Sequence, residues 1–186
     1  MSGNTFGAEL YSDGKMIAPM MPTFPDLTKC KKCDTLAWLS DMKEIGTLDG
    51  SHPEWRNADR VEFLEVADLA RFLDMDSVKT NAVKERIVRQ HIWWAFNDRV
   101  RNDKRNILYH DAESALWKEN CRRLAEVLDP TDTHQRIMKA ELFRTFGQFD
   151  ECMKLLNAIT DEKYRWVIEK YQTECDKENN LLFMLR

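Results

Sequence analysis

The sequence predicts a mainly α-helical protein, in which antiparallel helical hairpins follow a small irregular or β-containing N-terminal element. Most of the six glycines and five prolines lie before residue 54, and both residue types interrupt regular structure. From about residue 59, apolar residues recur three and four positions apart, which is the spacing of one helix face. We therefore expect an N-terminal element over residues 1–55 and a helical domain over residues 56–186 that folds on its own.

The composition is that of an ordinary water-soluble protein with enough apolar residues for a core. The chain has 186 residues, of which 43% are hydrophobic and 32% are charged. Its net charge of −4 argues against a general nucleic-acid binder, which normally carries a basic excess. No apolar run is long enough to span a bilayer, and the N-terminus lacks the features of a signal peptide. We expect a cytoplasmic protein with reduced cysteines and no membrane partner.

Turn signals divide the N-terminal element into short extended segments. Residues 5–11 and 16–21 predict two strands, because the turn sequence Ser12-Asp13-Gly14-Lys15 separates them. Three prolines then favour an extended path towards Cys30, and residues 35–39 predict one more strand. A linker follows, marked by Gly46, Gly50 and Pro53.

Six helices are predicted after this linker from apolar spacing and from capping residues. They span residues 59–75, 77–101, 111–128, 131–146 and 149–158, and the sixth begins at Thr160 or Asp161. Ser77, Asp111 and either Thr131 or Thr133 are the predicted caps of the second, third and fourth helices. The core-facing positions predicted for the long second helix are Val78, Val83, Ile87, Trp94 and Ala95, with Ile92 and Trp93 widening the face.

One helical hairpin, at about residues 133–160, carries a repeat-like pattern. The pattern consists of Ala140, Phe143, Gly147, Phe149, Cys152, Leu156 and Ile159. It resembles a tetratricopeptide repeat, which implies two closely packed helices with Gly147 in a left-handed conformation at the corner. Arg136 and Lys139 stand where the family has Trp and Leu, and any helical hairpin with a glycine turn would give a similar pattern.

A single cysteine knuckle, Cys30-Lys31-Lys32-Cys33, is the main candidate for metal chemistry. Two thiolates two residues apart can hold one edge of a tetrahedral zinc site, which needs four ligands. The spacing resembles a zinc-ribbon or rubredoxin knuckle, and together with the helical hairpin it resembles uncharacterised bacterial proteins with a ribbon-like element before a helical domain. That resemblance implies no activity.

Three interpretations of the knuckle stay open. It is half of a zinc ribbon whose other half is lost or lies upstream in a longer protein, a redox dithiol, or a turn with two unligated thiols. His52 is a weak third-ligand candidate, and the next cysteine is Cys121. We therefore expect this chain to hold zinc weakly or not at all.

The tryptophan-rich stretch 91–101 is the candidate for a ligand or partner surface. Trp93, Asn97 and Arg101 share one helix face and combine a ring, an amide and a guanidinium group, as ligand pockets do. The alternative is a central helix packed on two sides. The sequence lacks a glycine-rich phosphate loop, a His-Glu-x-x-His motif and a nucleophile elbow, which disfavours an enzyme.

These observations predict a non-catalytic cytoplasmic module that binds a protein or peptide partner or acts as a scaffold. Two alternatives remain. One is a zinc-ribbon adaptor that contacts nucleic acid through Lys29, Lys31 and Lys32. The other is an enzyme or ligand binder with a pocket near Trp93 and Arg101.

Overall fold

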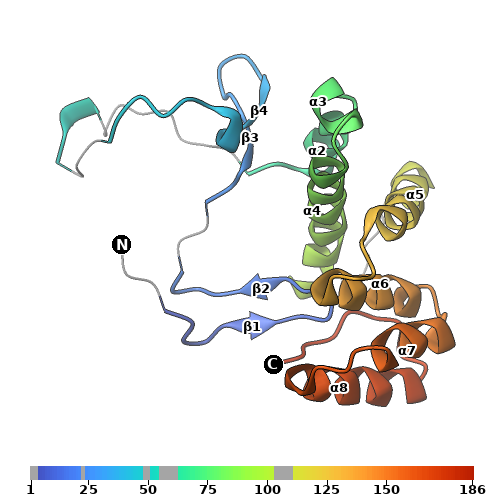
Figure 1. Cartoon of the computed structure of the whole chain (residues 1–186). Coiled ribbons are helices and arrows are strands. Elements are labelled where there is room, and N and C mark those ends of the chain that lie inside the picture. The colour runs from blue at the N-terminus through green and yellow to red at the C-terminus, as the bar shows by residue number, and fades with distance from the viewer. Residues whose placement is uncertain (1–3, 22–23, 48–50, 55–62, 103–110) are drawn as a thin grey trace.

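The computed structural model describes residues 4–21, 24–47, 51–54, 63–102 and 111–186. These residues form mainly helices, with short antiparallel strands near the N-terminus (Figure 1). The predicted fold class is therefore confirmed. Within the described ranges, no helix combines the length and the apolar character needed to cross a membrane.

Two short hairpins make up the N-terminal part. Strand β1 (Glu9–Leu10) pairs with β2 (Met16–Ile17) across the predicted turn, where Gly14 has a φ of 76°. Strand β3 (Leu27–Lys29) pairs with β4 (Leu36–Trp38), and the 3-10 helix η1 (Leu39–Asp41) follows. The prolines predicted only an extended approach here, so β3 is a partner strand that local signals did not reveal.

The C-terminal segment lies beside β1 (Figure 1). The backbone N–H of Leu185 donates to the carbonyl of Leu10 at 2.7 Å, and the N–H of Ser12 donates to the carbonyl of Phe183 at 2.9 Å. Strand β1 is thus bonded on one side by β2 and on the other by the end of the chain.

The helices begin with α2 (Val66–Phe72), α3 (Asp76–Lys79) and α4 (Ala82–Arg101). The predicted start of the first helix at residue 59 lies outside the described residues. The predicted second helix with Ser77 as its cap is wrong, because Ser77 lies inside α3 and Asn81 begins a separate helix. The Asn81 side chain accepts hydrogen bonds from the N–H groups of Val83 and Lys84 at 3.0 and 3.1 Å.

The buried face of α4 also differs from the predicted one. Val83 is 57% exposed, whereas Val88, Ile92, Trp93 and Phe96 are fully buried. The reason is that α2, α3 and α5 contact α4 from different sides, so the helix has no single apolar stripe for the sequence to reveal.

The remaining helices match the predicted ones to within a few residues. They are α5 (Asp111–Val127), α6 (Thr133–Thr145), α7 (Phe149–Asn157), the 3-10 helix η2 (Glu162–Tyr164) and α8 (Arg165–Asp176). The cap of α6 is Asp132 rather than a threonine, and its carboxylate accepts from the N–H of Gln135 at 2.8 Å. Helices α6, α7 and α8 lie in sequence order as consecutive antiparallel neighbours (Figure 1).

The hairpin of α6 and α7 has the predicted close packing. Ala140 and Cys152 are both fully buried. Gly147 turns the chain with a φ of 73°, and its N–H donates to the carbonyl of Arg144 at 2.8 Å. Small residues on facing helices allow this approach, because they leave no side-chain bulk between the two backbones.

The core includes residues from both sides of residue 55. Leu27 and Trp38 of the second hairpin are buried with Leu69 and Phe72 of α2, and the rings of Trp38 and Phe72 meet edge to face at 5.9 Å. These contacts weigh against independent folding of residues 56–186. The division of the chain at this position stays a prediction.

An ionic cluster joins β3 to α2. The Lys29 ammonium donates to Oδ2 of Asp68 at 2.9 Å, and a second contact joins Asp68 to Arg71 at 3.4 Å. Burial alone would raise the pKa of Asp68. Hydrogen bonds from Lys29 and the Glu65 backbone, together with the charges of Lys29 and Arg71, outweigh burial and hold this pKa below its ordinary value.

We predict that Asp68→Asn destabilises the protein in a pH-dependent way. A carboxyl group with a lowered pKa in the folded state stabilises the fold above its unfolded pKa, roughly pH 4. This stabilisation is lost as the pH falls through the lower folded value. Urea unfolding should show a loss of about 1 kcal/mol at pH 7 and a smaller loss near pH 3. Asp74→Asn, at an exposed position between α2 and α3, is the control. Equal losses for Asp68→Asn at pH 7 and pH 3 would contradict the claim that its ionised carboxylate stabilises the fold.

We also predict that Gly147→Val lowers the free energy of unfolding by about 1 kcal/mol or more, because a β-branched residue is strained at positive φ. A Cβ atom at this position meets no other atom within 4 Å, so backbone strain is the only expected cause. Gly147→Asn should lose less, since asparagine tolerates the left-handed region. Thermal denaturation tests both variants, and an unchanged melting temperature for the valine variant would refute the prediction.

Candidate functional site

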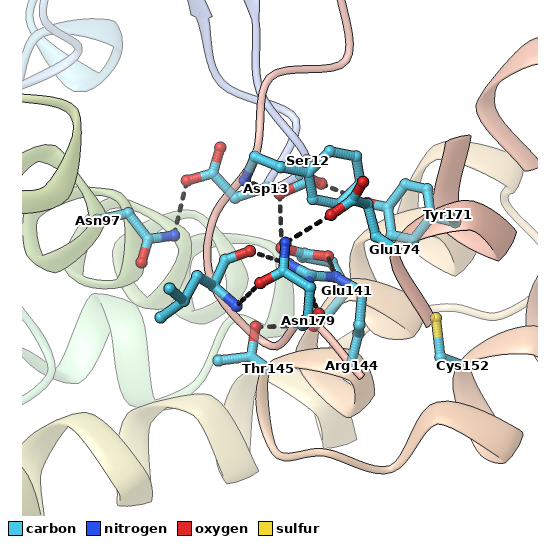
Figure 2. A network of polar contacts seen from close by, with 12 residues as sticks. Ser12, Asp13, Asn97, Glu141, Arg144, Thr145, Cys152, Tyr171, Glu174 and Asn179 are labelled. Carbon is cyan, nitrogen blue, oxygen red and sulfur yellow. Dashed lines mark hydrogen bonds and ion pairs between the residues drawn. The ribbon is translucent and has the colours of Figure 1, made fainter. Parts of the chain in front are cut away.

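The turn between β1 and β2 carries two fully buried polar residues, Ser12 and Asp13, into the helical part of the molecule (Figure 2). Oδ2 of Asp13 accepts hydrogen bonds from the amide of Asn97, at 2.7 Å, and from the guanidinium of Arg101. The carbonyl oxygen of Asp13 accepts from the indole N–H of Trp94 at 3.0 Å. One side of this turn is therefore bonded to three side chains of α4.

The other side of the turn is bonded to α6 and α8. The hydroxyl of Ser12 donates to Oε1 of Glu141 at 2.6 Å, and the phenol of Tyr171 donates to the carbonyl of Ser12 at 2.5 Å. Arg144 donates to both carboxylate oxygens of Glu141 at 2.7 Å each. The turn thus connects the three helices that surround it.

Arg144 extends this network to the C-terminal segment. Its guanidinium donates to the carbonyl of Leu181 at 2.8 Å and to that of Asn179. The same group lies over the ring of Phe183, 4.7 Å from the centroid. The Asn179 amide in turn donates to Glu174 of α8 at 2.6 Å (Figure 2).

Burial controls the protonation of this network. It raises the pKa of Glu141, while the hydrogen bonds from Arg144 and Ser12 oppose the rise. Burial also raises the pKa of Tyr171 well above its ordinary value. Tyr171 therefore keeps its proton at neutral pH and remains a hydrogen-bond donor.

The network is suited to holding segments together rather than to catalysis. Ser12, Asp13 and Arg144 expose none of their surface, and Glu141 exposes 1%. A substrate cannot reach the Ser12 hydroxyl, which already donates to Glu141 and accepts from the N–H of Phe183 at 3.3 Å. The arrangement fixes the hairpin and the end of the chain against α4, α6 and α8.

A cleft of about 690 Å³ opens beside this network. Its walls come from the first hairpin, α4, the start of α6, and the segment formed by η2 and α8. The lining residues are Leu10, Ser12, Gly14, Arg86, Gln90, Trp94, Asp132, His134, Gln135, Ile137, Met138, Lys163, Tyr164, Trp166, Val167 and Leu185. Three of these residues carry large aromatic rings, so the cleft offers flat apolar surface next to polar groups.

Some polar side chains of the cleft already have a hydrogen-bond or ion-pair partner among the described residues, and others do not. The hydroxyl of Tyr164 lies 3.0 Å from Nε2 of His134, and Lys163 pairs with Asp161 at 2.8 Å. Within the described part of the chain, Arg86 makes no hydrogen bond or ion pair. Its guanidinium is therefore a charged group available to a bound molecule.

The three residues predicted as a ligand surface are buried. Trp93 lies fully buried in the core, and Asn97 and Arg101 both bind Asp13. The cleft is lined instead by Trp94, which points about 100° away from Trp93 on the same helix. A ligand role for the predicted trio stays a prediction.

Sequence reasoning missed the wall of the cleft formed by α8. Trp166 is 39% exposed and lies outside the buried face of this helix, which consists of Val167, Tyr171 and Cys175. An exposed tryptophan outside a core stripe was the available signal, since such rings often mark binding surfaces.

The cysteine knuckle forms the turn between β3 and β4. The N–H of Cys30 donates to the carbonyl of Thr35 at 2.9 Å, and the N–H of Asp34 donates to the carbonyl of Cys30 at 2.8 Å. Both thiols are exposed. The hydrogen bond between Cys33 and the Thr35 hydroxyl, at 3.1 Å, lowers the pKa of Cys33, and the Thr35 backbone and Cys30 add to this effect.

Ion pairs hold the knuckle against α2. Arg71 contacts Oδ2 of Asp34 at 2.6 Å and its carbonyl oxygen at 3.2 Å. The Lys29 ammonium lies 3.6 Å from the other oxygen of Asp34. Arg71 thus fixes the turn that carries the two thiols to the helical part.

The other predicted ligands do not join the two cysteines. Among the described residues, no group of three or more His, Cys, Asp or Glu side chains is arranged to hold a metal ion. Nδ1 of His52 accepts from the N–H of Glu54 at 3.3 Å. Cys121 is buried in the core, which raises its pKa. Cys30 and Cys33 therefore remain a pair of candidate ligands.

No family model, curated protein or solved structure matches this chain. The functional argument consequently rests on the geometry of the cleft and of the knuckle.

We predict that Asp13→Ala lowers the free energy of unfolding by about 3 kcal/mol, because Asp13 is the fully buried one of the two carboxylates that pair with the buried guanidinium of Arg101, the other being Asp98. Lys15→Ala is the control from the same turn. It removes the partly exposed Lys15–Asp98 pair, at 2.6 Å, and should cost less than about 1 kcal/mol. Urea denaturation measures the free energy of unfolding of both variants. A loss for Asp13→Ala no larger than that for Lys15→Ala would show that the buried Asp13–Arg101 pair contributes little to stability.

Proposed function

We propose that the protein is a non-catalytic cytoplasmic interaction module that binds a peptide segment of a partner protein in the cleft between α4, α6 and α8. The observation that carries this proposal is the lining of the cleft, which includes Trp94, Tyr164, Trp166 and an Arg86 that has no ion-pair partner among the described residues. Tryptophan, tyrosine and arginine dominate the binding energy of protein interfaces.

The helical arrangement supports the same function. The packing of α6 on α7 and of α7 on α8 gives a short stack of antiparallel helices. Stacked helical repeats bind peptides along the surface that the stack creates. Residues of α6 and α8 both line the cleft, so this stack supplies one of its walls.

Charge indicates which peptide fits. Arg86 and the amide of Gln90 lie on the α4 wall, and the Lys163 ammonium lies on the opposite lining segment. The Asp132 carboxylate also lines the cleft, but it caps α6 by accepting from the Gln135 N–H. We therefore infer a peptide that carries a carboxylate next to an apolar or aromatic side chain.

A small-molecule ligand is the second candidate, because a volume of about 690 Å³ lies within the range of ligand pockets. The nucleic-acid alternative has less support. Its lysines are Lys29, Lys31 and Lys32, and the first of these already contacts Asp34 and Asp68. The net charge of −4 also opposes a polyanionic partner.

A random dodecapeptide phage library panned against the immobilised protein tests the proposal. Enriched peptides are synthesised, and their dissociation constants are measured by fluorescence anisotropy for the wild type and for variants. We expect carboxylate-containing sequences. Trp166→Ala should weaken their binding about tenfold, which corresponds to about 1.4 kcal/mol. Trp166 lies outside the apolar core, so this variant should fold normally.

Two further variants sharpen the result. Arg86→Glu should reject the acidic peptides and accept versions in which lysine replaces the acidic residue. Lys154→Ala, on the exposed surface of α7, is the matched control and should bind like the wild type. The proposal fails if no peptide is enriched, or if the enriched peptides bind the Trp166→Ala variant as tightly as the wild type.

A further inference from the structure

The cysteine knuckle is a half-site presented on the surface. Cys30 and Cys33 lie in the turn that joins β3 to β4, and both side chains are exposed. Figure 1 shows this hairpin at the opposite end of the molecule from α7 and α8. A second molecule can therefore approach the thiols without displacing any part of the helical stack.

We propose that two copies of this chain share one zinc ion, held by Cys30 and Cys33 of each copy. A structural zinc site needs four ligands in tetrahedral arrangement, and the knuckle supplies two. The described residues bring no third His, Cys, Asp or Glu side chain to these thiols. Because no further ligand from the described residues reaches the thiols, a second copy can supply the missing pair with no other residue required.

Symmetry makes a second copy a suitable partner. When a two-fold axis passes through the metal, each chain contributes the same pair of ligands, and the assembly closes at two chains. The tetrahedral geometry sets the two knuckles against each other at about a right angle, which keeps the rest of the two chains apart.

Hydrogen bonds within the chain already order the backbone of the knuckle. Hydrogen bonds link Cys30 to Asp34 and to Thr35, and Asp34 adopts a φ of 57° that few residues other than glycine favour. Arg71 holds this strained residue through its side chain and its carbonyl. Because the turn is already ordered, little of the metal-binding free energy is spent on ordering it.

Charge also favours the shared site. Four thiolates around Zn²⁺ leave a net charge of about −2 at the site. Lys31 and Lys32 lie between the two cysteines of each copy, so the assembly carries four lysines in the turns that hold the metal. Attraction between these lysines and the anionic zinc centre offsets their mutual repulsion.

The test uses the full chain, kept under a non-thiol reductant so that disulfide-linked dimers cannot form. The metal-free protein is titrated with zinc chloride, its mass is followed by native mass spectrometry and sedimentation, and bound zinc is measured by elemental analysis. We expect a 22.0 kDa monomer without metal. With zinc, we expect a dimer that contains one zinc per two chains and dissociates when a chelator is added.

Variants assign the ligands. Cys30→Ser and Cys33→Ser should each abolish zinc binding and dimerisation, while the metal-free melting temperature stays the same because both thiols are exposed. His52→Ala should keep the dimer and the ratio of one zinc per two chains. In the cobalt-substituted dimer, tetrathiolate coordination should give strong charge-transfer and tetrahedral ligand-field absorption.

Three results would overturn the proposal. One zinc per chain in a monomer would mean that the remaining ligands come from the same chain. A protein that binds no zinc would mean that the thiols are unligated. A zinc-linked dimer that persists in both cysteine variants would mean that other residues hold the metal. None of these results bears on peptide binding in the cleft, so the two proposals are tested separately.

Discussion

Two arginines with buried guanidinium groups, Arg101 and Arg144, set the condition that the rest of the structure must meet. A guanidinium group away from water is tolerated only when carboxylates and carbonyl oxygens surround it. Asp13 and Asp98 supply carboxylates for Arg101, and Glu141 supplies one for Arg144. The first hairpin supplies Asp13 to Arg101, and the C-terminal segment supplies two carbonyl oxygens to Arg144. If either segment moved away, a buried guanidinium group would lose hydrogen-bond acceptors.

The same condition gives the cleft its shape. The Ser12 hydroxyl and carbonyl are bonded to Glu141 of α6 and Tyr171 of α8, while the indole of Trp94 on α4 is bonded to the carbonyl of Asp13. The walls of the cleft are therefore connected behind it by buried hydrogen bonds. A cleft held in this way is already formed before binding, which reduces the entropy lost when a partner docks.

Local signals in the sequence predicted most of the helices and strands but few of the tertiary contacts between them. Gly14 and Gly147 adopt the positive φ values that their turns suggested. The break at Asn81 was missed because Ser77 is an equally acceptable cap on local grounds, whereas in the structure the Asn81 side chain caps α4. The burial of Asp13 could not be foreseen, since a polar turn sequence normally lies in water and its partners are more than 80 residues away.

Helix α4 explains why Trp94 rather than Trp93 lines the cleft, and it links the two candidate sites within one fold. Its 20 residues span roughly 30 Å. Near its start, Lys84 bonds to Asp41 and lies over the ring of Trp38, next to the hairpin that carries the knuckle. Near its end, Arg101 binds the buried turn. A helix with neighbours on several sides buries one of two adjacent tryptophans whichever way it turns. Which ring faces the cleft is decided by the indole bond to the Asp13 carbonyl, a contact between segments that no local pattern encodes.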